Sequence, residues 1–183
     1  MIRHLRQGDF TTMPWANGRG TTVEMLRVDR DGKLLWRLSR ASVIEDGPFS
    51  VFAGIDRSLT VISGAGFDLR GDTMHLHARP LVPVAFQGDV QISAVGVTGP
   101  CEDFNVMVAR GLVVAQVDVV TSCEMSAACG TAAVFAIAPS VVKGIALAAY
   151  DVILTDEPVT LAGLAIVVRV LSIETTMANL KNV

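Results

Sequence analysis

The sequence is poor in charge, in aromatic side chains and in cysteine, and these shortages exclude several classes of protein. Charged residues make up 18% of 183 positions, the formal net charge is −3, and the basic residues are scattered singly. Nucleic-acid binding needs a clustered positive surface, so we expect no nucleic-acid partner. Cys101, Cys123 and Cys129 form an odd number without a CxxC pair. This is typical of reduced thiols in a cytoplasmic protein.

The sequence also lacks a long, uninterrupted apolar run, although 51% of its residues are hydrophobic and its mean hydropathy is +0.49. The longest uncharged stretch, 125–142, contains Gly130 and Pro139 and barely reaches the length of a membrane-spanning helix. We therefore expect buried strands there and no membrane partner. No apolar segment follows the basic residues at the start of the sequence, so the predicted location is cytoplasmic.

What the sequence has in abundance is apolar and β-branched residues that repeat with a period of two. This pattern predicts strands at 22–28, 34–43, 59–62, 90–97, 104–108, 112–120, 132–138, 145–154 and 164–173. Turn residues separate the strands, and no long amphipathic helix is apparent beyond a short turn at 11–15. Many short strands at this spacing predict an all-β sandwich or barrel.

The pattern falls into two parts, which predicts two stacked β-barrels in one chain. We expect one domain at 1–111, which carries the polar motifs, and a second at 112–183, with an approximate boundary. Two pairs of acidic residues, Asp68 with Asp72 and Glu102 with Asp103, are interpreted as turn residues.

Most aromatic and amide side chains lie in short polar runs of the first 111 residues, and this concentration predicts a site. The runs are Pro14-Trp-Ala-Asn17-Gly-Arg-Gly20-Thr-Thr22-Val-Glu24, Trp36-Arg37-Leu-Ser39, Gly47-Pro-Phe49-Ser50-Val-Phe52 and Asp103-Phe-Asn105-Val-Met107. Because alternate residues of a strand share a face, Thr22 lies with Glu24, Arg37 with Ser39, and Asn105 with Asp103 and Met107. Faces that enclose one barrel would form a polar pocket.

Each of these residues also has a purely structural interpretation. Arg37 can pair with Glu24 inside the barrel, and Asn17 can serve only as a turn residue. Trp15 and Phe49 can be core residues. The combined case for a site is stronger, because so many buried polar groups are costly unless something uses them.

A metal site is not expected from the sequence, and no cofactor is predicted. His75 and His77 form an HxH pair that a strand would aim at one face. A mononuclear site needs a third ligand, but no carboxylate follows His77 closely, and the remaining histidine is His4. A metal bound by this pair remains the less favoured alternative.

The polar runs, in their order along the chain, resemble those of the HutD/Ves family. The matching segments are Pro14-Trp15-Ala-Asn17-Gly18-Arg-Gly20, Thr22-Val-Glu24, Trp36-Arg37-Leu-Ser39-Arg-Ala41, Asp46-Gly47-Pro48-Phe49-Ser50-Val-Phe52-Ala-Gly54-Ile-Asp56-Arg57, Phe86-Gln-Gly88-Asp89 and Asp103-Phe104-Asn105-Val-Met107. The resemblance covers roughly the first 111 residues. Ala16 and Arg19 depart from it, because relatives often have Lys and Gly there.

The resemblance implies a bicupin, that is, two cupin β-barrels in one chain. It also implies a binder of a small carboxylate from histidine breakdown, such as formylglutamate or urocanate, which moderates histidine utilisation. It implies no established enzymatic activity.

The leading hypothesis is a metal-free pocket in which Arg37 pairs with a ligand carboxylate while Asn17, Ser39 and Asn105 hydrogen-bond to it. Arg57 is either a second anchor for the ligand carboxylate or the partner of Asp56 in a loop salt bridge. Trp15, Phe49 and Phe52 would form the apolar wall.

Two other hypotheses stay open. One is a metal-independent cupin isomerase or hydrolase with Glu24 as general acid–base. The other is a purely structural double barrel whose own side chains fill the pocket. An exposed edge strand would favour a homodimer.

Overall fold

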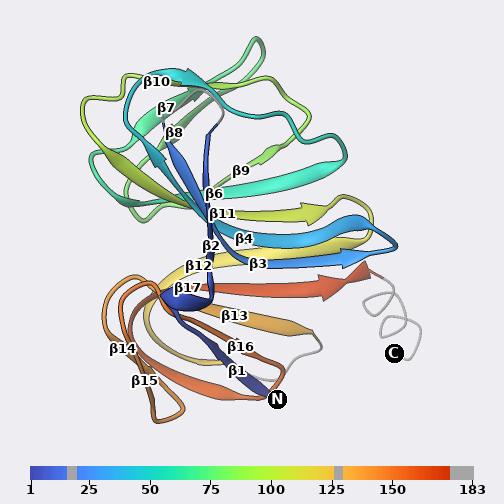
Figure 1. The fold of residues 1–183 in the computed structure, drawn as a ribbon, viewed down its shortest axis with the longest axis vertical. Helices are drawn as coiled ribbons and strands as arrows, with labels where there is room; N and C mark the ends of the chain where they lie inside the picture. The colour runs from blue at the N-terminus through green and yellow to red at the C-terminus, as the bar shows by residue number, and fades with distance from the viewer. Residues whose placement is uncertain (16–19, 126–129, 174–183) are drawn as a thin grey trace. The chain divides into compact units, whose positions relative to one another are not determined.

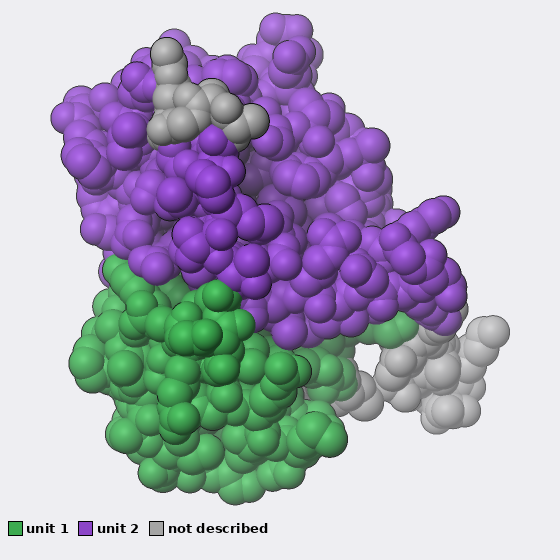
Figure 2. Space-filling model, in the orientation of Figure 1, with its two compact units in different colours: residues 1–10, 111–183 green, residues 11–110 purple. Residues whose placement is uncertain are grey.

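The computed structural model describes residues 1–15, 20–125 and 130–173, and these form an all-β protein (Figure 1). A short 3₁₀ turn, Gln7–Asp9, precedes the second strand. The chain divides into two compact units, which Figure 2 colours separately. Unit 2 comprises residues 11–110, and unit 1 comprises residues 1–10 together with the chain from Gly111 onward.

Unit 2 contains an antiparallel six-stranded sheet in the order β2-β3-β4-β11-β6-β9. The strands are β2 (Thr11–Pro14), β3 (Thr21–Arg30), β4 (Lys33–Val43), β11 (Cys101–Ala109), β6 (Ile55–Ser63) and β9 (Val84–Gln87). The long strands follow the alternation of the sequence. On β4, Arg37, Ser39 and Ala41 share one face, and Leu38 on the other face is fully buried.

A second, four-stranded sheet of unit 2 has the order β5-β10-β7-β8. Its strands are β5 (Gly47–Pro48), β10 (Ser93–Val95), β7 (Phe67–Arg70) and β8 (His75–Ala78). The two sheets share one hydrophobic core, since Leu59 and Val61 of the larger sheet pack with Phe67 and Leu69 of the smaller one. Each sheet thus has an inner face directed at this core.

Unit 1 is built on one antiparallel seven-stranded sheet. Its strands are β1 (Ile2–Leu5), β12 (Val113–Met125), β13 (Thr131–Ala136), β14 (Ser140–Val142), β15 (Ile145–Leu147), β16 (Val152–Thr155) and β17 (Val159–Ser172). The long strand β17 pairs with β12 and also with β13 and β14. The core of this unit includes Val134, Ile153 and Val167, which are fully buried.

Several sequence predictions need correction at the level of elements. Residues 11–14 are strand β2 and not a short turn. Asp68 lies within β7, and Glu102 and Asp103 lie within β11, so these three are strand residues and not turn residues. The predicted strand 145–154 is two strands, β15 and β16.

The reason for that last break is the backbone around Tyr150. Its φ of +72° lies in the left-handed region, which a continuous strand does not contain. The Asp151 carboxylate accepts a hydrogen bond from the Ala148 amide at 3.1 Å and closes the turn.

Within the described residues, no helix is long and apolar enough to cross a membrane.

Candidate functional site

A cavity of about 330 Å³ opens on the inner side of unit 2. It is lined by Trp15, Thr22, Arg37, Ser39, Ala41, Pro48, Phe49, Ser50, Phe52, Arg57, Asn105 and Met107. Most of the polar lining comes from β3, β4, β6 and β11, whereas Ser50 and most of the aromatic lining come from the segment around β5. The described residues leave this space unfilled.

Arg57 contributes a buried positive charge to this cavity. It is 5% exposed, and its Nη2 donates a 2.8 Å hydrogen bond to Asn105 Oδ1. Its guanidinium carbon lies 4.9 Å from the ring centre of Phe86, 5.4 Å from Phe52 and 5.5 Å from Phe49. Burial and the nearby charge of Arg37 lower the pKa of Arg57 to about 10, although the charge of Asp103 partly opposes this. No carboxylate among the described residues forms an ion pair with it.

The sequence left open whether Arg57 pairs with Asp56 in a loop. In the structure, Asp56 accepts a 2.7 Å hydrogen bond from Arg110 Nε, and Arg110 also pairs with Asp89 at 2.6 Å. The Asp56 carboxylate is therefore used outside the cavity, and Arg57 lines the cavity.

Arg37 differs from Arg57 because it has a carboxylate partner. Its Nε donates a 2.6 Å hydrogen bond to Glu24 Oε2. This internal ion pair is the purely structural interpretation that the sequence offered for Arg37, as an alternative to ligand binding. Arg37 still lines the cavity, whereas Glu24 does not belong to its lining.

Asp103 is a fully buried carboxylate next to the cavity wall. Asn105 links it to Arg57, because the Asn105 amide nitrogen donates to Asp103 Oδ1 while the amide oxygen accepts from Arg57. Burial raises the pKa of Asp103 to about 7, and the charge of Arg57 partly opposes this rise. The other oxygen, Oδ2, has no hydrogen-bond partner among the described residues.

Trp15 forms part of the wall, and its position depends on Gly20. The indole Nε1 donates a 2.9 Å hydrogen bond to Thr22 Oγ1. A Cβ atom at Gly20 would lie 2.8 Å from both Trp15 Cε3 and the Ser42 carbonyl oxygen. Only glycine lets the ring and the backbone approach this closely.

The structure brings most of the sequence-predicted site residues together. Trp15, Thr22, Arg37, Ser39, Phe49, Arg57 and Asn105 line one cavity, and Glu24 contacts it through Arg37. Asn17 lies outside the described residues. The predicted site residues did not include Pro48 or Ser50. Strand parity placed Asp103 on the same face as Asn105, but Asp103 was also interpreted as a turn residue and was left out of the predicted site.

The described lining residues of the unit 2 cavity include no histidine, cysteine or carboxylate, so they offer no set of metal ligands.

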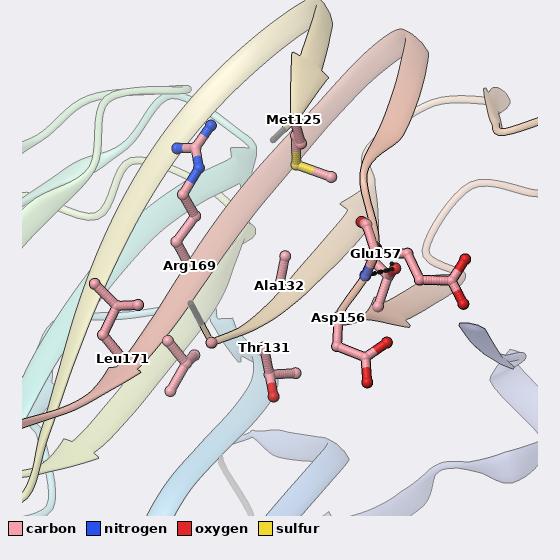
Figure 3. A pocket seen from close by; sticks show the side chains of 10 residues that line it. Met125, Thr131, Ala132, Asp156, Glu157, Arg169 and Leu171 are labelled. Atoms are coloured by element: carbon pink, nitrogen blue, oxygen red, sulfur yellow. Dashed lines mark hydrogen bonds between the residues drawn. The ribbon is translucent and has the colours of Figure 1, made fainter. Parts of the chain in front are cut away.

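Another hollow, in unit 1, is lined by residues that include Met125, Arg169 and Leu171 (Figure 3). Its volume of about 20 Å³ has room for roughly one water molecule. Arg169 is engaged elsewhere, with Asp118 at 2.8 Å. The 330 Å³ cavity of unit 2 is the candidate ligand site, because buried polar side chains and aromatic rings line it together.

Comparison with known proteins identifies relatives of this chain. The HutD family matches residues 7–167. An uncharacterised 21.2 kDa protein in the hutC 3′ region of Pseudomonas putida is 41% identical over 113 residues, or 59% of this chain. That match spans 58% of the P. putida protein, which is less than two thirds of its length.

Solved structures extend the match over almost the whole chain. HutD from Pseudomonas fluorescens SBW25, in a formate condition, has a TM-score of 0.87 and 33% identity, covering 94% of this chain and 99% of that one. A conserved protein of unknown function from Pseudomonas aeruginosa PAO1 has a TM-score of 0.84 and 30% identity, covering 94% and 100%.

A more distant structure shows the fold alone. The bacterial pirin YhhW from Escherichia coli, in complex with nickel(II), has a TM-score of 0.65 at 7% identity, covering 94% of this chain and 99% of that one. The fold is thus all-β and cupin-like. With a family match over residues 7–167 and two structural relatives at 30% identity or more, the chain belongs to the HutD family.

Proposed function

We propose that the cavity of unit 2 binds a small carboxylate and that the protein thereby moderates histidine utilisation. The observation that carries the proposal is Arg57, a buried cation that faces the cavity with no ion-pair partner among the described residues. An unpaired buried charge costs several kcal/mol, and an anionic ligand offsets that cost.

The rest of the lining suits a small acid. The Ser39 hydroxyl and the Asn105 amide can hydrogen-bond to ligand oxygens, and Phe49 and Phe52 exclude water from the guanidinium. A volume of about 330 Å³ lies at the lower end of the usual range for ligand sites. Formylglutamate and urocanate are acids of suitable size, and formate is the simplest carboxylate probe.

The link to histidine utilisation rests on the relatives. One lies in the hutC 3′ region of P. putida, and another is HutD of P. fluorescens. A binding protein associated with histidine utilisation would bind an acid of that pathway and limit flux through the pathway when the acid accumulates. The alternative, an enzyme with Glu24 as general acid–base, has less support because the Glu24 carboxylate is bonded to Arg37 and is not in the lining.

We propose further that the two units are the two barrels of a bicupin. Unit 2, residues 11–110, holds the site and falls within the predicted domain 1–111. Unit 1 contains the segment from Gly111 onward, and residues 1–10 join it because β1 pairs with β16.

The test is a thermal-shift titration of the metal-stripped protein with formate, formylglutamate, urocanate and glutamate, followed by mass analysis of the recovered ligand. A ligand at about 100 times its dissociation constant adds roughly 2.7 kcal/mol to the free energy of unfolding. We expect a raised melting temperature with at least one acid, and the acid recovered unchanged. An altered acid would support the enzyme instead, and no shift with any acid would contradict carboxylate binding.

A further inference from the structure

Four charged or titratable side chains cluster on the outer face of the four-stranded sheet of unit 2. Strand pairing places Asp68 opposite His77 and Arg70 opposite His75. The alternate residues of the same strands, Phe67, Leu69 and Ala78, are buried in the core. Asp68, His75 and His77 therefore point away from the core and are not part of the cavity lining.

The two imidazoles converge on one carboxylate. His75 Nε2 lies 2.8 Å from Asp68 Oδ2, and His77 Nδ1 lies 2.7 Å from Asp68 Oδ1. One ligand atom from each of the three residues lies within 4.8 Å of the other two. In a tetrahedral zinc site, with bonds of about 2.0–2.2 Å, ligand atoms are about 3.3–3.6 Å apart. Small side-chain rotations would thus bring all three atoms to bonding distance of one ion.

The cluster is accessible to an ion from solvent. The side chains of His75 and His77 are 47% and 57% exposed, and that of Asp68 is 26% exposed. Asp68 and His77 also line a shallow hollow of about 400 Å³, which leaves room for water or a further ligand on the ion. Arg70 opposes metal binding, since its Nη2 lies 3.1 Å from Asp68 Oδ2 and brings a positive charge to the site.

We propose that Asp68, His75 and His77 form a three-ligand site for a divalent transition-metal ion, with zinc as the reference ion. Two imidazole nitrogens and one carboxylate oxygen suit zinc, nickel or copper, whereas magnesium and calcium favour sites made of oxygen. The ligand missing from the sequence pattern is supplied by the preceding strand. Asp68 precedes both histidines in the sequence, and the β7–β8 hairpin register brings it to them.

The test is zinc titration of the metal-stripped full-length protein by calorimetry. We expect the unaltered protein to bind zinc at one site. The zinc affinity should fall about 10-fold or more in Asp68→Asn, and binding should be lost in the double variant His75→Gln/His77→Gln. Asp72→Asn is the matched control, because it removes the same charge from an exposed position of the same hairpin. Arg70→Gln should tighten zinc binding, since it removes the competing hydrogen bond and a like charge.

Nuclear magnetic resonance locates the ion independently. The chain has three histidines, so their ring-proton signals can be assigned by single substitutions. Copper(II) at substoichiometric amounts should broaden the signals of His75 and His77 and spare that of His4. Broadening of His4 alone, zinc binding that survives the double variant, or no zinc binding by the unaltered protein would each overturn the proposal.

Discussion

Arg57 and Asp103 are groups of opposite charge that unit 2 removes from water on neighbouring strands. They do not touch, and the amide of Asn105 bridges them. Burial favours the uncharged form of both groups, which lowers the pKa of Arg57 and raises that of Asp103. The amide orientation is fixed, because its oxygen faces the donor Arg57 and its nitrogen faces the acceptor Asp103.

Replacement of Arg57 by methionine should weaken carboxylate binding by roughly 10- to 100-fold. The variant keeps much of the side-chain volume but removes a charge-assisted hydrogen bond of about 1.5–3 kcal/mol. The free energy of unfolding should fall by no more than about 1 kcal/mol, since removal of a buried unpaired charge offsets the lost contacts. Calorimetry with the acid found by thermal shift measures the first effect, and urea denaturation measures the second.

Arg40→Gln is the control for that experiment. Arg40 lies on the opposite face of β4 from Arg37 and pairs with Glu102 at 2.7 Å. If Arg40→Gln and Arg57→Met reduced affinity equally, the effect would be one of net charge, and the direct role of Arg57 would be refuted.

Asp103 should make the protein less stable as the pH rises from about 4 to about 7. In the folded state its pKa is about 7, whereas the carboxyl of an unfolded chain titrates near pH 4. Between these values the folded state binds more protons, so the free energy of unfolding falls with rising pH and then levels off. Asp103→Asn should remove this slope, and Glu102→Gln on the opposite face should retain most of it, because burial raises the pKa of Asp103 more than the charge of Glu102 does. Urea denaturation at several pH values compares the three proteins; a slope unchanged in Asp103→Asn would be the contrary result.

For single residues, the sequence predicted which side chains share a face of a strand. It failed where a partner distant in the sequence decides which contact a side chain makes. Strand parity correctly placed Ser39 with Arg37 and Asn105 with Met107 in one lining. It did not reveal that Arg110 occupies Asp56 and leaves Arg57 for the cavity. That choice depends on a residue more than fifty positions away in the chain.

Among elements, the long strands were predictable, whereas several short ones were missed or merged. β3, β4 and β17 are long enough for their alternation to be recognised, whereas β5 and β14 have two and three residues. Such short strands are held by pairing with neighbours and not by a pattern of their own. The HxH pair shows the same limit, since hairpin pairing and not local sequence brings Asp68 to it.

The turn between β6 and β7 should depend strongly on Gly66. Its φ is +86°, and a Cβ atom there would lie 2.2 Å from the Ala78 carbonyl oxygen. Gly66→Ala combines backbone strain of about 1–3 kcal/mol with a steric clash. Gly96 has a φ of +76° with no atom within 4 Å of the added Cβ, so Gly96→Ala isolates the strain. Thermal unfolding should show a larger loss for Gly66→Ala; equal losses would mean that the β6–β7 turn relaxes freely.

For the whole molecule, all described lining residues of the cavity belong to unit 2. The sequence predicted two parts with the site in the first, because the polar motifs end near residue 111. It did not predict that β1 pairs with β16, since no local pattern links strands from opposite ends of the sequence.

A core substitution in unit 1 should therefore lower stability without changing ligand affinity. Phe135 is fully buried and stacks on Tyr150 with 5.7 Å between ring centres. Phe135→Leu should reduce the free energy of unfolding by about 1–3 kcal/mol. Carboxylate affinity, measured by calorimetry below the melting temperature, should stay within about twofold. A large loss of affinity would show that unit 1 controls the site.

The pairing of β1 with β16 also has a consequence for synthesis on the ribosome. Every strand pair of unit 2 lies within residues 11–110, so all of its partners are present once residue 110 has emerged. Strand β1 is made before unit 2, but its partner β16 emerges only after unit 2 is complete, and β12 likewise pairs with the later strand β17. During that interval a nascent chain carries the unpaired edges of β1 and β12, while the strands of unit 2 are all present. Those edges are where neighbouring nascent chains on one polysome would pair with each other first.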